Sequence, residues 1–259
     1  MKNVSPVIET RQLSVGIGAT TFCRELNLSL SPGERLGILG RNGAGKSTLL
    51  SVLAGIRAPT AGHVLLNNST YHQLGARRSA LIRGWLPQTR GDAFSSTVME
   101  TALIGRHPHL DRWAWESAAD MTIVRAALAD MDLTGLEDRD ICTLSGGERQ
   151  RLAMAALIAQ TPQLFLLDEP VAFLDLKHQI SVLERFSRSA RENQATVVMV
   201  LHEPALAWRF CDQVLLIHGN GTVELGPSKE LLTAERLSAL YQYPMRTVKY
   251  QGGVAFVPD

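Results

Sequence analysis

The segment Gly40–Ser47 has the sequence Gly-Arg-Asn-Gly-Ala-Gly-Lys-Ser and limits the possible folds of this chain more than any other segment. It satisfies the phosphate-loop pattern, in which glycines let the backbone curl so that successive amide N–H groups point at phosphate oxygens. The apolar run Leu36–Leu39 precedes it, and Ser47–Leu53 follows with helical character. A buried strand, this loop and a helix N-terminus in succession predict an α/β fold that binds a phosphate-bearing ligand.

Individual positions of the loop have distinct expected roles. Lys46 can reach the β- and γ-phosphates of a nucleotide, and the Ser47 hydroxyl can ligate Mg²⁺. ATP and Mg²⁺ are therefore the expected cofactors. The other positions that we assign to ATP binding are Gly40, Asn42, Gly43, Ala44, Gly45 and Thr48.

The segment Leu164–Glu169 is the expected second half of such a site. Its apolar run predicts a buried strand that ends in two carboxylates. Asp168 is then aimed at the Mg²⁺ shell, and Glu169 is placed to polarise an attacking water as general base. Apolar strands often end in acidic loops, so this motif by itself does not indicate a catalytic site. It does so here because the phosphate loop is also present.

A third segment, Leu144–Gln150, reads Leu-Ser-Gly-Gly-Glu-Arg-Gln and opens a helix. Ser145 as N-cap, with Gly147 behind it, predicts a second helix N-terminus that can bind an anion. One chain has no obvious need for two phosphate cradles per nucleotide. A head-to-tail dimer does, since each partner can complete the other's site.

Composition excludes several classes of protein. The 259 residues include 26 Lys and Arg against 25 Asp and Glu, so no nucleic-acid partner is expected. Cys23, Cys142 and Cys211 lack disulfide-framework or zinc-ribbon spacing, which favours a reducing compartment. The apolar runs are too short to cross a bilayer, so the expected location is the cytosol unless another chain holds the protein at a membrane.

The pattern along the chain predicts one domain over residues 1–259. Short strands are expected at Val7–Leu13, Leu26–Leu30 and Val64–Leu66, and buried parallel strands at Leu164–Leu167 and Thr196–Leu201. Residues 90–160 are mostly helical in pattern. We therefore expect a nucleotide-binding core formed by residues 1–89 and 161–259, with a helical lobe at 90–160 inserted between strands of the sheet.

The three motifs Gly40–Ser47, Leu144–Gln150 and Leu164–Glu169, in this order, resemble those of ATP-binding cassette (ABC) proteins. The resemblance extends from about Val7 to Leu240, and its signature sequence is specific to that family. It implies the ABC ATPase fold of the P-loop NTPases: a RecA-like core, an antiparallel β subdomain and an inserted α-helical lobe. It also implies an ATPase subunit that acts as a homodimer at the cytoplasmic face of the cell membrane. Its partners would be transmembrane permease subunits and, indirectly, a substrate-binding protein.

The resemblance assigns further positions. Gln88 matches the glutamine that reaches Mg²⁺ and the attacking water, so the implied metal set is Ser47, Gln88 and Asp168. His202 matches the switch histidine that contacts the γ-phosphate. Asp175 matches a loop that crosses the dimer interface, although a helix N-cap is its ordinary explanation. The tyrosine common under adenine is missing from Val15–Gly18, which leaves Ile17 or Phe22 to cover the base.

Two further segments narrow the substrate class. Thr97–His109 and Phe173–Gln179 resemble importers of ferric siderophores, haem and cobalamin. An exporter ATPase and a non-transport cassette ATPase remain alternatives. The first would share every catalytic residue, and the second usually has two cassettes or long coiled coils. We interpret His107 and His109 as ordinary polar residues rather than a metal pair, and Trp113 and Trp115 as packing or docking residues.

Overall fold

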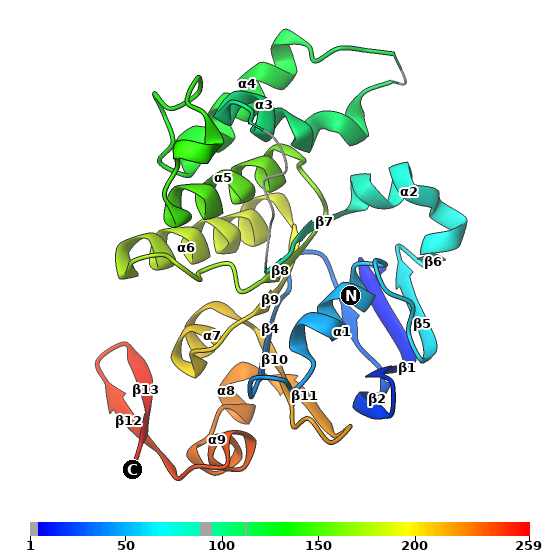
Figure 1. The fold of residues 1–259 in the computed structure, drawn as a ribbon. Helices are drawn as coiled ribbons and strands as arrows, with labels where there is room; N and C mark the ends of the chain where they lie inside the picture. Colours follow the sequence, from blue (N-terminus) through cyan, green and yellow to red (C-terminus); the bar gives the residue numbers. More distant parts are fainter. Residues whose placement is uncertain (1–4, 89–94, 112) are drawn as a thin grey trace.

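The centre of the molecule is a mostly parallel β-sheet (Figure 1). The computed structural model describes residues 5–88, 95–111 and 113–259. Among them the sheet has six strands, in the order β11 (Val223–Pro227), β10 (Gln213–Ile217), β4 (Arg35–Gly40), β9 (Thr196–Val200), β8 (Leu164–Asp168) and β7 (Arg83–Leu86). Only the β10–β11 pair is antiparallel. The two parallel strands predicted from apolar runs are thus confirmed.

A smaller antiparallel sheet flanks the first and holds β1 (Ile8–Ile17), β2 (Thr20–Leu26), β3 (Ser29–Leu30), β5 (Ala61–Leu66) and β6 (Ser69–Thr70). The prediction at Leu26–Leu30 was wrong in extent, because β2 ends where it was expected to begin. β1 also continues past Leu13 to Ile17, where it turns into β2 through Gly18 at a φ of 57°. Glycine reaches that left-handed conformation without strain, so the turn is tight.

Strand residues alternate between two hydrophobic clusters, one on each face of the larger sheet. Phe165 and Leu167 of β8 pack with helices α5 (Gly146–Ala159), α6 (Leu176–Asn193) and α7 (Pro204–Phe210). Leu164 and Leu166 face helix α1 (Lys46–Leu53) and the smaller sheet. Figure 1 shows α1 and α6 on opposite sides of the strands. A strand buried on both faces explains the continuous apolar runs in the sequence.

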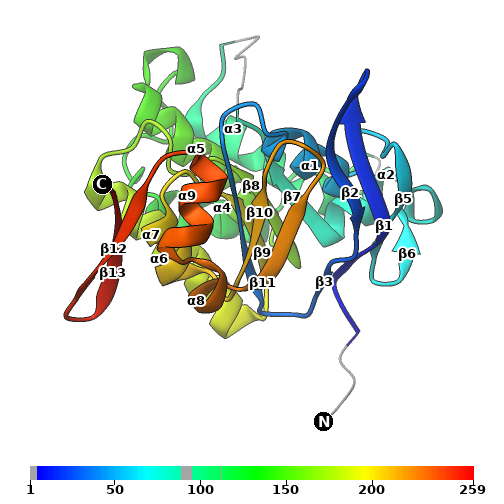
Figure 2. The same ribbon diagram turned by 90° about the horizontal axis from the view of Figure 1, so that it is seen from below.

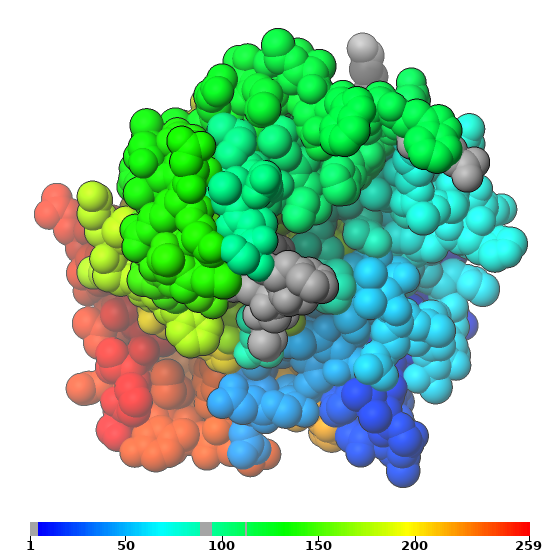
Figure 3. Space-filling view, turned by 45° about the horizontal axis from the view of Figure 1, so that its top comes forward, coloured from blue at the N-terminus to red at the C-terminus, as the bar shows by residue number. Residues whose placement is uncertain are grey.

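Helices dominate the inserted segment, as the sequence predicted. It contains α3 (Val98–Leu103), the 3₁₀ turn η1 (Ile104–His109), α4 (Ala118–Asp130), η2 (Ile141–Thr143) and α5. In Figure 3 this green region covers one end of the molecule, with the N-terminal strands in blue below it. The predicted border between core and lobe, near residues 89 and 90, lies outside the described residues, so the domain boundaries stay a prediction.

The remaining elements lie at the margins. Helix α2 (Tyr71–Ile82) joins β6 to β7, while α8 (Ser228–Leu231), α9 (Ala234–Tyr241) and the hairpin β12 (Met245–Tyr250) with β13 (Gly253–Pro258) follow β11. Figure 2 shows the hairpin on the side opposite β1 and β2. Across the described residues, no helix combines the length and the apolar character that a membrane span requires. Neither α2 nor the hairpin was predicted from the sequence.

Candidate active site

Four neighbouring parallel strands end at the same edge of the sheet, and each leads into a predicted site residue. β4 leads into the loop Gly40–Ser47, β9 leads to His202, β8 ends at Asp168, and β7 is followed by Gln88. The register of β4, β9, β8 and β7 aligns these ends. Ligands of open α/β sheets bind outside the carboxyl ends of such strands.

One cavity of about 460 Å³ gathers most of the predicted residues at this edge. Its lining consists of Phe22, Asn42, Gly43, Gly45, Lys46, Ser47, Thr48, Gln88, Glu169 and His202. Gly40 and Ala44 belong to the same loop but do not line the cavity, and Ala44 is buried. The structure therefore brings together residues that are up to 180 positions apart in sequence (Phe22 to His202).

The loop needs glycine at two positions for conformational reasons. Gly43 and Gly45 have φ values of 79° and 92°, in the left-handed region. A Cβ atom on Gly45 would also lie 2.3 Å from the Phe22 ring. Gly45 is the N-cap of α1, which starts at Lys46, so the helix N-terminus opens directly onto the cavity.

Lys46 is buried and bound within its own loop. Its Nζ donates to the carbonyl oxygens of Gly40, at 2.8 Å, and Arg41, at 3.1 Å. Burial lowers the pKa of the Lys46 ammonium, and the nearby charges of Glu169 and Asp168 oppose that shift. The loop thus holds a partly desolvated cation beside a row of amides that suits phosphate oxygens.

Ser47 and Asp168 form an oxygen pair in the same cavity region. The Ser47 hydroxyl donates to Asp168 Oδ1 at 3.0 Å. Burial raises the pKa of the Asp168 carboxyl, and the hydrogen bond from Ser47 is the main opposing effect. A buried carboxylate beside a hydroxyl is a donor set of the kind Mg²⁺ uses, so these residues fit that ion.

Glu169 and His202 contact each other directly, a contact that the sequence analysis did not predict. Glu169 Oε1 lies 2.7 Å from His202 Nε2. Glu169 has a φ of 50°, an uncommon conformation for a residue other than glycine that costs free energy and tends to occur at functional sites. Glu169 follows β8 and His202 follows β9, and these are neighbouring parallel strands. The expectation that such strands end at one edge of the sheet is the only signal in the sequence that could have suggested this contact.

Ser145 and Gly147 lie outside this cavity. Ser145 is the N-cap of α5, as predicted: its hydroxyl accepts from the Glu148 amide at 3.3 Å, and its own amide donates to the Glu148 carboxylate at 2.7 Å. Exposed Gln88 lines both the phosphate-loop cavity and a second one, of about 450 Å³, that Gly146 of α5 lines. The chain alone therefore does not bring its two helix N-termini to one ligand.

Asp175 is the N-cap of α6, accepting from the His178 amide at 2.9 Å. Two apolar side chains near it are turned to solvent, with Phe173 81% and Leu176 71% exposed, whereas Leu174 is buried. The N-cap role does not exclude an interface role, since the loop before α6 presents apolar surface that nothing in the described chain covers.

The model of the ABC transporter family matches residues 23–172 of this chain. The chain belongs to the ABC transporter family. It is 36% identical to the hemin import ATP-binding protein HmuV of Burkholderia pseudomallei, covering 96% of this chain and 98% of that protein. It is 37% identical to the petrobactin import ATP-binding protein FpuD of Bacillus anthracis, covering 87% of this chain and 82% of that protein.

A solved structure agrees with this assignment. An ABC transporter of the metal-chelate type, in an inward-facing conformation, has a chain that superposes with a TM-score of 0.85 at 31% identity. The match covers 98% of both chains. The ABC ATPase fold expected from the motif resemblance is thus confirmed for this family member.

The weaker predictions for this ABC protein have mixed outcomes. Phe22 lines the phosphate-loop cavity, whereas Ile17 does not, although the adenine contact itself stays a prediction. His109 contacts the Gln160 carbonyl through Nε2 at 2.9 Å, and no group of three potential metal ligands occurs in the described ranges. Trp113 and Trp115 are 87% and 89% exposed, so neither belongs to the buried core, and a docking role stays a prediction.

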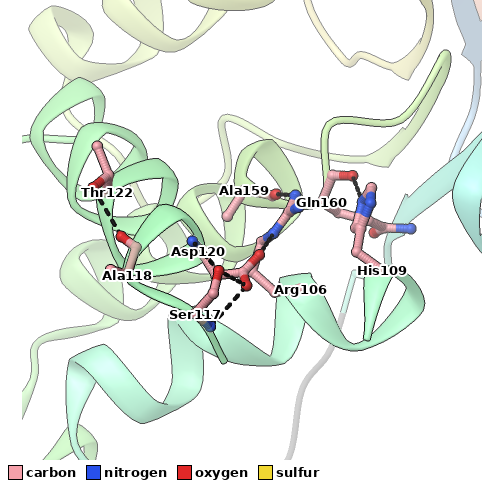
Figure 4. Close-up of polar contacts among 8 residues, drawn as sticks. All are labelled: Arg106, His109, Ser117, Ala118, Asp120, Thr122, Ala159 and Gln160. Atoms are coloured by element: carbon pink, nitrogen blue, oxygen red, sulfur yellow. Dashed lines mark hydrogen bonds and ion pairs between the residues drawn. The ribbon is translucent and has the colours of Figure 1, made fainter. Parts of the chain in front are cut away.

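Arg106, which the sequence analysis passed over, joins the far end of the signature helix α5 of this ABC subunit to the rest of the lobe (Figure 4). Its guanidinium donates to the Ala159 carbonyl at 2.6 Å and to Asp120 Oδ1 at 2.8 Å, and it is buried. Asp120 in turn accepts from the Ser117 hydroxyl at 2.6 Å. The hydrogen bonds from Ser117 and Arg106 hold the pKa of the Asp120 carboxyl well below its usual range.

Replacing Arg106 with Met should therefore destabilise the lobe. Removing one partner of a buried pair leaves the other uncompensated, and the melting temperature is expected to fall by roughly 6–12 °C for a chain of this size. Because the Asp120 pKa is depressed, its stabilising contribution is complete at neutral pH and is lost only on acidification below about pH 4.

The matched control is Arg77→Met, which removes the exposed ion pair of Arg77 with Asp111 at 3.2 Å and an exposed hydrogen bond to the Pro108 carbonyl at 3.1 Å. Such pairs contribute little to stability, so its melting temperature should stay within about 2 °C of the parent. Equal losses in the two variants, measured by calorimetry at pH 7, would contradict the role given to Arg106.

Proposed function

We propose that this chain is the ATP-hydrolysing motor subunit of an ABC importer for iron–siderophore, haem or cobalamin-type substrates. The observation that carries the proposal is the single cavity that Lys46, Ser47 and the Glu169–His202 pair line, with buried Asp168 hydrogen-bonded to Ser47 behind it. Positioning and preorganised charge of this kind are what phosphoryl transfer requires. The substrate class follows from what the names of the relatives say they import.

Nucleotide binding is assigned to the loop and its helix. Lys46 exchanges its bonds to the Gly40 and Arg41 carbonyls for the β- and γ-phosphates, while the amides of the loop bind phosphate oxygens. Ser47, Asp168 and Gln88 would hold Mg²⁺, which supplies neutralising charge to the phosphates when bound. Phe22, at the cavity and beside Gly45, is the better placed of the two candidates for the adenine base.

Hydrolysis is assigned to Glu169. Its carboxylate accepts a proton from water as the water oxygen bonds to the γ-phosphorus and the bond to the β–γ bridging oxygen breaks, giving ADP and phosphate. His202 contacts the Glu169 carboxylate at 2.7 Å and lines the same cavity, and we assign to it the contact with the γ-phosphate. Glu169 has a positive φ at the end of β8 and lines the cavity.

The working unit is a head-to-tail homodimer. Ser145 and Gly147 lie outside the cavity of their own chain, which supports their assignment to the nucleotide of a second copy. Exposed Phe173 and Leu176, which flank Asp175, provide apolar surface for that contact. ATP then stabilises the closed dimer because it binds both faces, and hydrolysis reopens it.

The dimer passes its motion through the helical lobe, residues 90–160, to transmembrane permease subunits at the cytoplasmic face of the membrane. A substrate-binding protein on the other side delivers the cargo. Exposed Trp113 and Trp115 on the lobe suit docking to such a partner.

Reconstitution with the permease subunits in proteoliposomes tests the function. ATP-dependent uptake of an iron chelate, haem or cobalamin is expected, and it should be absent with Lys46→Ala subunits, which lack the cation that binds the phosphates. The importer assignment would be rejected if the cargo were transported outward. It would also be rejected if the rate of ATP hydrolysis did not change with the permease or with any of the three cargo classes.

A further inference from the structure

A further cavity, lined mostly by charged side chains, lies between α6 and α7, away from the nucleotide site. It has a volume of about 310 Å³ and is lined by Arg35, Glu184, Ser187, Arg188, Arg191, Arg209 and Phe210. Arg35 is the first residue of β4, whose opposite end carries the phosphate loop, so about 17 Å of strand separates the two places. The nucleotide proposal uses none of these residues.

The cavity has more positive charge than its carboxylates neutralise. Arg35 is fully engaged by Asp212, with Nε–Oδ2 at 3.0 Å and Nη2–Oδ1 at 2.7 Å. Arg209 reaches Glu184 only at 3.5 Å, and both side chains are more than half exposed, so that pair is weak. In the part of the chain that the structure describes, no ion pair joins Arg188 or Arg191 to a carboxylate.

A buried hydroxyl in the wall of this cavity also lacks a partner. Ser187 is 2% exposed, and its Oγ has no hydrogen-bond partner among the described residues. Most buried polar groups are paired, and leaving one unpaired costs free energy. Other helical serines of this chain, such as Ser238, satisfy the hydroxyl by donating to the carbonyl four residues earlier, and Ser187 does not.

We propose that this cavity is a binding site for a small phosphate-bearing anion, distinct from the nucleotide site. Arg188 and Arg191 lie on consecutive turns of α6, and Arg209 faces them from α7, so guanidinium groups from two helices converge on one space. Guanidinium forks match phosphate oxygens two at a time, and the Ser187 hydroxyl adds a donor at the wall. Glu184 repels an anion, which places the phosphate on the side of Arg188 and Arg191.

Occupancy of the site bridges the two helices. α6 follows the loop that holds Asp175, and α7 follows His202 and Glu203, so both helices lead directly out of the nucleotide edge of the sheet. A ligand that binds only when α6 and α7 are packed together stabilises the folded state by mass action. The site therefore has a measurable signature even without knowledge of the natural ligand.

The test uses full-length Lys46→Ala protein, in which the phosphate loop is disabled, titrated with sodium diphosphate against sodium chloride of equal ionic strength. Diphosphate should raise the melting temperature by a few degrees, and calorimetric titration should give a dissociation constant. Adding Arg188→Gln and Arg191→Gln should weaken that binding by about 100-fold, since two charge-assisted contacts are lost. The matched control, Arg57→Gln with Arg78→Gln, removes the same charge from exposed positions elsewhere and should leave binding unchanged.

Ser187→Ala separates ligand binding from folding. It should weaken diphosphate binding by about 3- to 10-fold while leaving the unliganded protein at least as stable, because it removes an unpaired buried hydroxyl. A second arm uses phosphatidylglycerol vesicles with phosphatidylcholine vesicles as control. If the protein binds phosphatidylglycerol vesicles but not phosphatidylcholine vesicles, and the Arg188/Arg191 double variant loses that binding, then a lipid headgroup is the source of the phosphate. The proposal is overturned if the double variant matches its control in both arms.

Discussion

Replacing Glu169 with Gln is expected to lower the rate of ATP hydrolysis by about 10²- to 10⁴-fold, the usual contribution of a positioned general base. The amide keeps the shape of the carboxylate and its ability to contact His202, which lies 2.7 Å away in the parent. It cannot take a proton from water. ATP binding should be unchanged, because Lys46 and the amides of the phosphate loop are untouched.

The same variant should accumulate as a closed dimer in the presence of MgATP, since the step that reopens the dimer is blocked. Phosphate release and size-exclusion chromatography measure the two effects. Glu203→Gln is the matched control, because this exposed neighbour makes no side-chain cap bond in α7 and should hydrolyse ATP at the parental rate. Parental hydrolysis by Glu169→Gln would remove Glu169 from the role of general base.

The sequence was most informative where local chemistry alone determines the structure. Gly43 and Gly45 could be predicted as loop glycines because a phosphate loop needs backbone conformations that other residues adopt at a cost. Ser145 could be predicted as an N-cap because a serine before two glycines and a glutamate has one favoured arrangement at a helix start. Both predictions need only a few adjacent residues.

Contacts between distant segments could not be predicted in this way. The Glu169–His202 pair depends on the order of strands in the sheet, and the pairing of β8 with β9 sets its geometry. The Arg106–Asp120 pair depends on how η1 and α4 pack against the end of α5, for which no local pattern exists. The strand predicted at Leu26–Leu30 failed for a related reason: pairing with β1, rather than apolar content, decides where β2 ends.

The second large effect is expected from a substitution of Ser145, the N-cap of the signature helix α5, because the proposed dimer places it at the partner's nucleotide. Ser145→Glu places a negative charge at the N-terminus that is proposed to face the partner's γ-phosphate. At about 4 Å and an effective dielectric constant of about 20, that repulsion costs about 4 kcal/mol at each of the dimer's two nucleotides, or roughly 1,000-fold per site in the stability of the ATP-bound dimer. Binding of ATP to the isolated subunit should not change, because Ser145 does not line the cavity of its own chain.

Thr97→Glu is the matched control for the lost cap. Thr97 begins α3 with the same capping box, its hydroxyl accepting from the Glu100 amide at 3.1 Å as Ser145 does from Glu148 at 3.3 Å. Both variants lose about 1 kcal/mol of capping, and only Ser145→Glu should abolish the dimer that MgATP traps in the Glu169→Gln background.

Mixing separates a head-to-tail dimer from every arrangement in which a chain completes its own site. Subunits with Ser145→Glu keep an intact phosphate loop, and subunits with Lys46→Ala keep an intact signature helix. In the Glu169→Gln background, neither variant by itself should form a homodimer with ATP. The mixture should form a heterodimer with one complete site, which energy transfer between labelled chains would detect. If Ser145→Glu dimerises as readily as its parent, or if the mixture gives no transfer over a range of protein concentrations, then Ser145 does not reach across to a partner's nucleotide.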